Sequence, residues 1–244
     1  MAREIGTDGK QLFAQNASQM GSRLPFDPHR PALLLLGPTG SGKTPLGEEL
    51  VRRGLTGRRA VHFDFGAQLR RIVDSPPPNL LSPSEVAFLQ GILATGALLE
   101  DEHFPLALRI LRWFASQAQL RSGEWLILNG LPRHRGQAEA MVELVDVAAV
   151  AELVCPPEVV VYRIQSNIGG DRQGRPDDEL PLVRRKLEIY HTRTRPIIHF
   201  YRQLAIPVID LHVTPTTTEA ELATTLEECL VRLIKGQTDT LSQS

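Results

Sequence analysis

Short apolar runs alternate along the chain with longer segments in which apolar residues recur every three or four positions. Such runs are typical of strands that are buried on both faces, and the helical segments between them provide the crossovers of a parallel sheet. The pattern therefore predicts an α/β fold in which helices cover a parallel sheet. The predicted strands lie at Ala32 to Leu36, Ala60 to Phe63, Trp125 to Leu128, Ala148 to Val154 and Val208 to Leu211.

Two stretches depart from this alternation and predict insertions beside the sheet. Residues Arg70 to Arg121 contain a proline-rich turn and then two apolar-periodic stretches, Val86 to Leu99 and Phe104 to Leu120, which predict a helical hairpin. Residues Ile168 to Pro176 contain glycine and arginine but little apolar content. We expect an exposed loop there.

The rest of the chain is organised around one domain. A long helical stretch follows the exposed loop, and Pro181 and Pro196 are predicted to interrupt it. Met1 to Arg30 and Gly236 to Ser244 are polar and are predicted to be flexible tails. A single domain is therefore expected to span residues 31–235.

Composition restricts the class of protein. The 244 residues are 42% hydrophobic and 23% charged, which is ordinary for a soluble α/β domain. With 27 basic and 28 acidic side chains the formal net charge is −1, so no overall positive field favours nucleic acid or an anionic membrane as a partner. No apolar run is long enough for a signal peptide or a membrane span, and we expect a cytoplasmic protein.

The most informative motif directly follows the first predicted strand. It matches the pattern G-x-x-x-x-G-K-[ST] with Gly37, Pro38, Thr39, Gly40, Ser41, Gly42, Lys43 and Thr44. In such a loop the backbone N–H groups surround the β- and γ-phosphates, the lysine adds positive charge, and the hydroxyl reaches the bridging Mg²⁺. We expect these eight residues to bind ATP, with Thr44 at the metal.

Polar residues also follow the other predicted strands at their carboxyl ends, where open α/β sheets bind ligands. Asp64 and Arg70 follow the second strand, and Asn129 and Arg133 follow the third. Three more arginines come after the fourth strand and its helix, namely Arg163, Arg172 and Arg175. Phosphoryl transfer between two polyanions needs several cations around the transferring group, so this arrangement favours a kinase.

Together with the phosphate loop, five segments resemble the adenylate kinase family of nucleoside monophosphate kinases. They are Phe65 to Arg70, Gly91 to Leu99, Trp125 to Arg133 with Gln137, Gly174 to Asp178, and Lys186 to Tyr201. The likeness extends over about Ala32 to Ile234. It implies a three-layer P-loop fold with a five-stranded parallel sheet, a helical monophosphate-binding insertion at about 65–122, and a short lid at about 166–177.

The resemblance also implies a reaction and a role for individual residues. The reaction is transfer of the ATP γ-phosphoryl group to a nucleoside monophosphate, with AMP as the expected acceptor. The implied enzyme is a monomer that uses Mg²⁺. The implied catalytic residues are Lys43, Arg133, Arg163, Arg172 and Arg175. The implied acceptor-binding residues are Asp64, Phe65, Arg70, Leu98, Arg133 and Gln137. Arg70 and Arg133 would hold the acceptor phosphate, and Gln137 would read its base.

Several positions depart from the family pattern and keep other functions open. Asn129 replaces an aspartate that acts near the metal, so we expect it to reach Mg²⁺ only through a water. Phe65 and Lys186 replace a threonine and an arginine, and these changes are also compatible with a nucleotide-binding regulator that lacks turnover. Asp64 is either a helix cap or the base that deprotonates an alcohol, in which case the protein is a small-molecule kinase.

Overall fold

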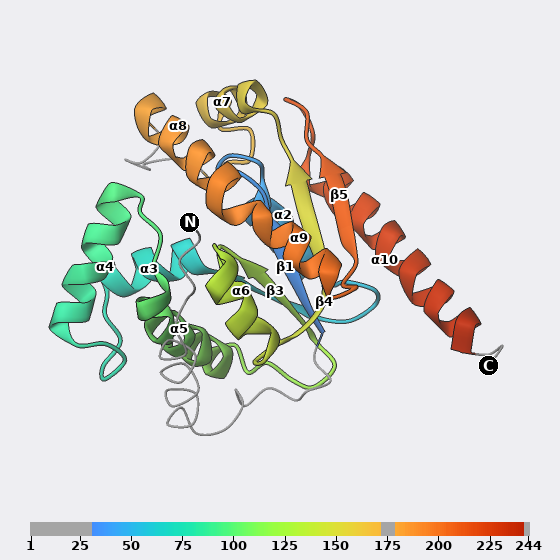
Figure 1. The fold of residues 1–244 in the computed structure, drawn as a ribbon, viewed down its shortest axis with the longest axis horizontal. Coiled ribbons are helices and arrows are strands. Elements are labelled where there is room, and N and C mark those ends of the chain that lie inside the picture. Colours follow the sequence, from blue (N-terminus) through green and yellow to red (C-terminus); the bar gives the residue numbers. More distant parts are fainter. Residues whose placement is uncertain (1–30, 172–178, 242–244) are drawn as a thin grey trace, which may run out of the picture.

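The computed structural model describes residues 31–171 and 179–241, the side chains up to residue 235, and builds them around one five-stranded parallel sheet (Figure 1). The strand order is β2-β3-β1-β4-β5. The strands are β1 (Pro31–Leu36), β2 (Ala60–Asp64), β3 (Trp125–Asn129), β4 (Asp146–Val154) and β5 (Val208–His212). The predicted fold class and sheet are confirmed.

β1 lies in the middle of the sheet and is buried on both faces. Its successive side chains point to opposite faces, so one short apolar run supplies two hydrophobic cores. The first core is closed by α3 (Phe65–Asp74), α5 (Phe104–Gln117), α6 (Arg135–Val142) and α9 (Pro196–Gln203), together with part of the insertion. The second is closed by α2 (Lys43–Arg53), α7 (Pro157–Ser166), α8 (Leu180–Ile189) and α10 (Glu219–Leu241).

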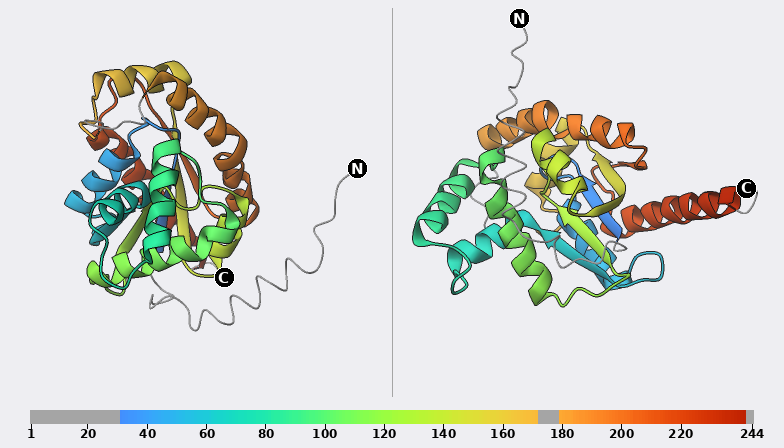
Figure 2. Two further views of the ribbon diagram at one scale, coloured as in Figure 1. Left: turned by 90° about the vertical axis from the view of Figure 1, so that its left-hand side faces the viewer. Right: turned by 60° about the horizontal axis from the view of Figure 1, so that its bottom comes forward.

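The predicted helical hairpin forms beside the sheet. It consists of α4 (Pro83–Thr95), a 3-10 turn at Asp101–His103, and α5. Ser82 starts α4 with a capping box, in which its hydroxyl accepts from the Glu85 amide while the Glu85 carboxylate accepts from the Ser82 amide. Figure 1 and the right-hand view of Figure 2 both show α3, α4 and α5 together at one end of the molecule.

The helical stretch after the lid is interrupted by one of the two expected prolines. Pro181 lies in the first turn of α8, where a missing N–H has no cost, so it begins that helix. Pro196 follows a π-helical turn, Tyr190–Thr194, in which the Arg195 amide donates to the Tyr190 carbonyl oxygen at 2.8 Å. The wider turn accommodates a proline that an uninterrupted α-helix would not.

α10 continues to Leu241 and so extends into the segment Gly236 to Ser244, for which composition predicts a flexible tail. Extending an existing helix is far easier than nucleating one, and a single glycine costs only about 1 kcal/mol relative to alanine. No described helix combines the length and the apolar character needed to cross a bilayer.

α2 packs against β2 through a close approach between Gly47 and the ring of His62. A Cβ atom at position 47 would lie 2.4 Å from both Cε1 and Nε2 of that ring. Only a glycine fits without movement of the ring or of the helix. This contact fixes the distance of the helix that follows the phosphate loop from the strand that ends at Asp64.

We expect Gly47→Ala to lower the free energy of unfolding by about 1–3 kcal/mol, the usual cost of overpacking. Chemical denaturation with a constant m-value measures the change. Gly91→Ala is the matched control, since a Cβ there meets no atom within 4 Å and the substitution should raise stability by up to about 1 kcal/mol. If Gly47→Ala lowers the free energy of unfolding equally in a His62→Ala background and in the wild type, the proposed clash is contradicted.

Candidate functional site

The phosphate loop joins β1 to α2 and has the backbone conformation that its glycines permit. Gly40 and Gly42 have φ angles of +74° and +100°, and Gly42 is the N-cap of α2. Both glycines are also closely packed, because a Cβ at Gly40 would lie 2.7 Å from Ile164 and one at Gly42 would lie 3.3 Å from Arg163. Among the described residues no side chain caps α2, and the dipole of a helix that begins at such a loop favours an anion at its N-terminus.

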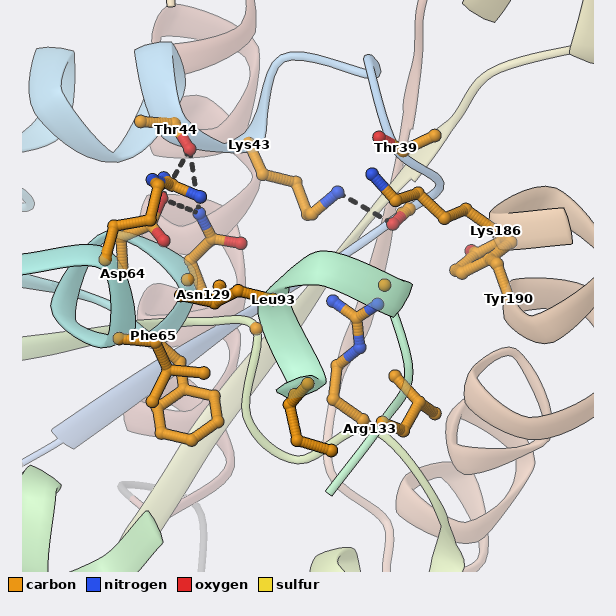
Figure 3. A pocket seen from close by; sticks show the side chains of 18 of the residues that line it. Thr39, Lys43, Thr44, Asp64, Phe65, Leu93, Asn129, Arg133, Lys186 and Tyr190 are labelled. Atoms are coloured by element: carbon orange, nitrogen blue, oxygen red, sulfur yellow. Dashed lines mark hydrogen bonds between the residues drawn. The ribbon is translucent and has the colours of Figure 1, made fainter. Parts of the chain in front are cut away.

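Lys43 lies along the inside of this loop (Figure 3). Its Nζ atom donates to the carbonyl oxygens of Gly37 at 2.8 Å and Pro38 at 2.6 Å. The Ser41 hydroxyl donates to the same Pro38 oxygen at 2.9 Å. These bonds hold the loop in a closed curve with an ammonium group beside it, which is the arrangement expected for a bound triphosphate.

Three polar side chains meet at the carboxyl ends of β2 and β3. The parallel register pairs Asp64 with Asn129, and Thr44 from α2 completes the group. The Thr44 hydroxyl donates to Oδ2 of Asp64 at 2.5 Å, and the Asn129 amide donates to the same oxygen at 2.9 Å and to Thr44 at 3.2 Å. The other carboxylate oxygen, Oδ1, accepts from the Ala67 amide at 2.9 Å, so Asp64 is the N-cap of α3.

The surroundings of Asp64 favour its charged form. Burial raises the pKa of its carboxyl group, but the hydrogen bonds from Thr44 and from the Ala67 amide, together with the charges of His62 and Arg70, outweigh burial and leave the pKa below its usual value. The cap expected from the sequence is therefore present. The same carboxylate also faces the hydroxyl that a phosphate loop presents to its metal.

The predicted acceptor arginines, Arg70 and Arg133, line the same pocket as the phosphate loop, and the charge of Arg70 acts on Asp64. Arg133 is held by its backbone: its amide donates to Gln137 at 2.8 Å, and its carbonyl oxygen accepts from Thr194 at 2.8 Å. Burial lowers the pKa of its guanidinium, while the charge of Asp64 opposes that change. Its Nε atom has no hydrogen-bond partner within the described part of the chain. Such a half-buried cation is suited to an anionic ligand.

An apolar wall completes the pocket between the insertion and α3. It is lined by Phe65, Leu69, Ile92, Leu93, Leu98 and Leu99. Phe65 is 6% exposed, and its ring centroid lies 6.0 Å from that of Phe63, so it belongs to the core as well as to the pocket. A wall of this kind next to two arginines can hold a flat apolar group whose other end is anionic.

The segment that carries this wall is tied to the rest of the domain. The carbonyl oxygen of Leu99 lies 2.9 Å from Nε2 of both His134 and Gln137. Next to it, Arg193 forms two bonds of 2.6 Å to the carboxylate of Glu100 and holds the pKa of that group below its usual value. The acceptor side of the pocket is thereby positioned by α6 and by the π-helical turn.

Four predicted site residues of the described chain do not line the pocket, namely Pro38, Ser41, Gln137 and Arg163. Gln137 is 1% exposed, and its two polar atoms bond to the backbone of Arg133 and Leu99, so it orients the turn and the wall instead of facing a base. Arg163 is also buried, and it donates to the carbonyl oxygens of Thr214 and Thr217 at 3.0 and 2.8 Å. The predicted lid arginines, Arg172 and Arg175, lie outside the described residues.

Other residues in the pocket were not expected from the sequence. Tyr190, which periodicity predicts as a packing residue, lines the pocket beside Lys186 (Figure 3). Its hydroxyl donates at 3.2 Å to the buried Glu152, which also lies 3.4 Å from Arg195. Nothing in the local sequence distinguishes this tyrosine from a core residue, because its partners come from a distant strand.

Within the described residues, no three His, Cys, Asp or Glu side chains are grouped to hold a metal ion. A metal that accompanies ATP needs fewer protein ligands, since Mg²⁺ is usually held by one or two carboxylates together with phosphates and water. Thr44 and Asp64 supply oxygen atoms at this position, whereas Asn129 presents its amide nitrogen to both of them.

No family model matches the chain. Over 176 residues it is 35% identical to the adenylate kinase of Xanthomonas campestris pv. campestris, covering 70% of this chain and 85% of that protein. The adenylate kinase of Xylella fastidiosa is 34% identical over 179 residues, which cover 71% of this chain and 87% of the other. A gluconokinase structure from Sinorhizobium meliloti matches 88% of this chain and 99% of its own, with a TM-score of 0.52 and 17% identity, and therefore supports the fold alone.

We expect Lys43→Ala to weaken binding of Mg·ATP by about 10- to 100-fold, because it removes a charged partner of the phosphates. Isothermal titration calorimetry measures the affinity, and circular dichroism verifies that the fold is retained. Lys235→Ala on α10 is the control, since that residue lies away from the phosphate loop. Unchanged affinity of the Lys43 variant would contradict the assignment of the loop.

Proposed function

Because the chain belongs to the adenylate kinase family, we propose that this P-loop kinase transfers the γ-phosphoryl group of ATP to a nucleoside monophosphate, with AMP as the preferred acceptor. One observation carries the proposal. A single pocket connects the phosphate loop to two arginines and to an apolar wall. That combination suits two anionic phosphate groups that approach each other and one flat base.

In this proposal the chain contributes position and charge. Gly40, Gly42 and Lys43 hold the triphosphate, while Arg70 and Arg133 hold the acceptor phosphate in line with it. No side chain acts as a general base, since a phosphate oxygen is already a nucleophile. Mg²⁺, when bound beside Thr44, would neutralise charge on the β- and γ-phosphates.

The proposal includes the two arginines of the expected lid. Arg172 and Arg175 would add positive charge to the transferring group when the lid closes, and closure would exclude water from it. Arg163 would act from behind the loop, since its Nη2 atom lies close to Gly42. Lys186 is a further cation at the pocket lining.

The alternative of an alcohol acceptor depends on Asp64 acting as a base. Geometry favours it less, because Oδ1 already accepts from the Ala67 amide and Oδ2 from Thr44 and Asn129. A base needs an oxygen directed at the hydroxyl that it deprotonates. The phosphate acceptor therefore has the stronger support.

ADP release from Mg·ATP, measured against AMP, CMP, UMP, GMP, dTMP and no acceptor, tests the proposal. AMP-dependent turnover that disappears in Lys43→Ala is the expected result. A preference for another monophosphate would retain the reaction but change the acceptor, and would direct attention to Phe65. If no acceptor stimulates ADP release while Mg·ATP still binds, the proposal is rejected in favour of an alcohol acceptor or a regulator without turnover.

We expect Arg133→Ala to lower turnover with the preferred acceptor by more than a factor of about 100 and to leave the affinity for Mg·ATP unchanged. The reason is that its guanidinium would contact the acceptor phosphate and not the triphosphate. Steady-state kinetics and calorimetry measure the two effects separately. Arg232→Ala, an exposed arginine on α10, serves as the control, and near-normal rates for the Arg133 variant would refute the assigned role.

A further inference from the structure

A carboxylate lies where the proposed reaction would bring two polyanions together. Asp64 lines the pocket beside Lys43, Thr44 and Asn129. The three groups that donate hydrogen bonds to it, from Thr44, Ala67 and Asn129, are all uncharged, and the positive charge of Arg70 acts on it without a hydrogen bond. A negative charge in this place repels phosphate groups at short range unless a cation stands between them.

The direction in which the Asp64 carboxylate points indicates which cation would lie between it and the phosphates. Oδ2 is directed at the Thr44 hydroxyl, the group that a phosphate loop presents to Mg²⁺. Mg²⁺ prefers oxygen ligands and is commonly bound through one carboxylate together with phosphates and water. A hydroxyl and a carboxylate in hydrogen-bond contact are thus a suitable pair for this ion.

We infer that Asp64 provides the carboxylate of the Mg²⁺ site, directly or through a water, and that Asn129 is the residue that positions it. The inference rests on the proposed use of Mg·ATP and is independent of the acceptor. It differs from the expectation that Asn129 reaches the metal through a water.

The register of the two strands explains why position 129 is an amide. Asp64 and Asn129 are paired across β2 and β3, and the Asn129 nitrogen lies 2.9 Å from Oδ2 of Asp64. A second carboxylate at that distance would place two like charges in contact. The site therefore accommodates one negative charge at these two positions. The Asn129 amide adds no second charge, and its hydrogen bond fixes the rotamer of Asp64.

Asp64→Asn tests the inference with little risk to the fold. Asparagine has nearly the same shape and caps helices as well as aspartate, so the bond to the Ala67 amide and the start of α3 are retained. The probe is the non-hydrolysable analogue AMPPNP, titrated by calorimetry with excess Mg²⁺ and separately in EDTA. No acceptor is present, so the result does not depend on turnover.

We expect opposite effects on the two forms of the nucleotide. Asp64→Asn should weaken binding of Mg·AMPPNP and leave metal-free AMPPNP bound equally or more tightly, because a repulsive charge has been removed. The ratio of the two affinities should fall by at least about tenfold. Asp210→Asn on β5, an exposed aspartate, should leave the ratio unchanged.

The inference is overturned if the ratio of the affinities for Mg·AMPPNP and metal-free AMPPNP in Asp64→Asn equals that of the wild type. Equal weakening of both forms of the nucleotide would also overturn it, since a merely structural role would affect both forms alike. The double variant Asp64→Asn with Asn129→Asp returns one negative charge to the strand pair, but not to the atom that the Thr44 hydroxyl contacts, so the preference for the magnesium form should stay low. Full recovery of the preference in the double variant would overturn the assignment of the carboxylate to Asp64. If no monophosphate stimulates ADP release but the ratio of AMPPNP affinities falls as expected, the proposed acceptor is rejected and the metal site is supported.

Discussion

The parallel register between β2 and β3 sets the position of the groups at the centre of the pocket. Parallel strands end at the same edge of a sheet, so Asp64 and Asn129 come together although 65 positions separate them. α2 adds Thr44 to the pair, and its distance from β2 is fixed by the contact of Gly47 with His62. A change in either packing relation would separate the hydroxyl from the carboxylate.

Buried charge is distributed in this molecule so that most of it already has a partner. Glu152 is bonded by Tyr190, Arg163 is bonded by backbone carbonyl oxygens, and Lys43 is held by its own loop. Arg133 differs from Arg163, because its backbone is held on both sides while its Nε atom has no partner among the described residues and its guanidinium makes no hydrogen bond like those of Arg163 to backbone carbonyl oxygens. Such an arrangement keeps a guanidinium ready for a ligand at little cost in reorganisation.

The acceptor side depends on bonds made by residues that would not touch a substrate. Gln137 and His134 hold the Leu99 carbonyl, and Arg193 holds Glu100. These contacts connect the helical insertion to α6 and to the turn before Pro196. A resemblance in sequence assigns Gln137 to the base, whereas the structure gives both of its polar atoms to the backbone.

The sequence alone determined the features that depend on local order. The strand run before Gly37 to Thr44 and the helical hairpin of the insertion were predicted, and the Asp64 helix cap was one of two alternatives, because periodicity, glycines and capping residues act over a few positions. It did not predict the continuation of α10 beyond Gly236, since polar composition alone does not prevent an existing helix from extending.

Only the tertiary structure decided the relations between distant segments. It showed that Gln137 and Arg163 turn to backbone partners, that Tyr190 reaches Glu152, and that Asp64 faces Thr44. These relations depend on sheet register and helix packing, which bring together residues tens of positions apart. No pattern read along the chain contains those distances, because they are set only when both faces of the sheet are buried.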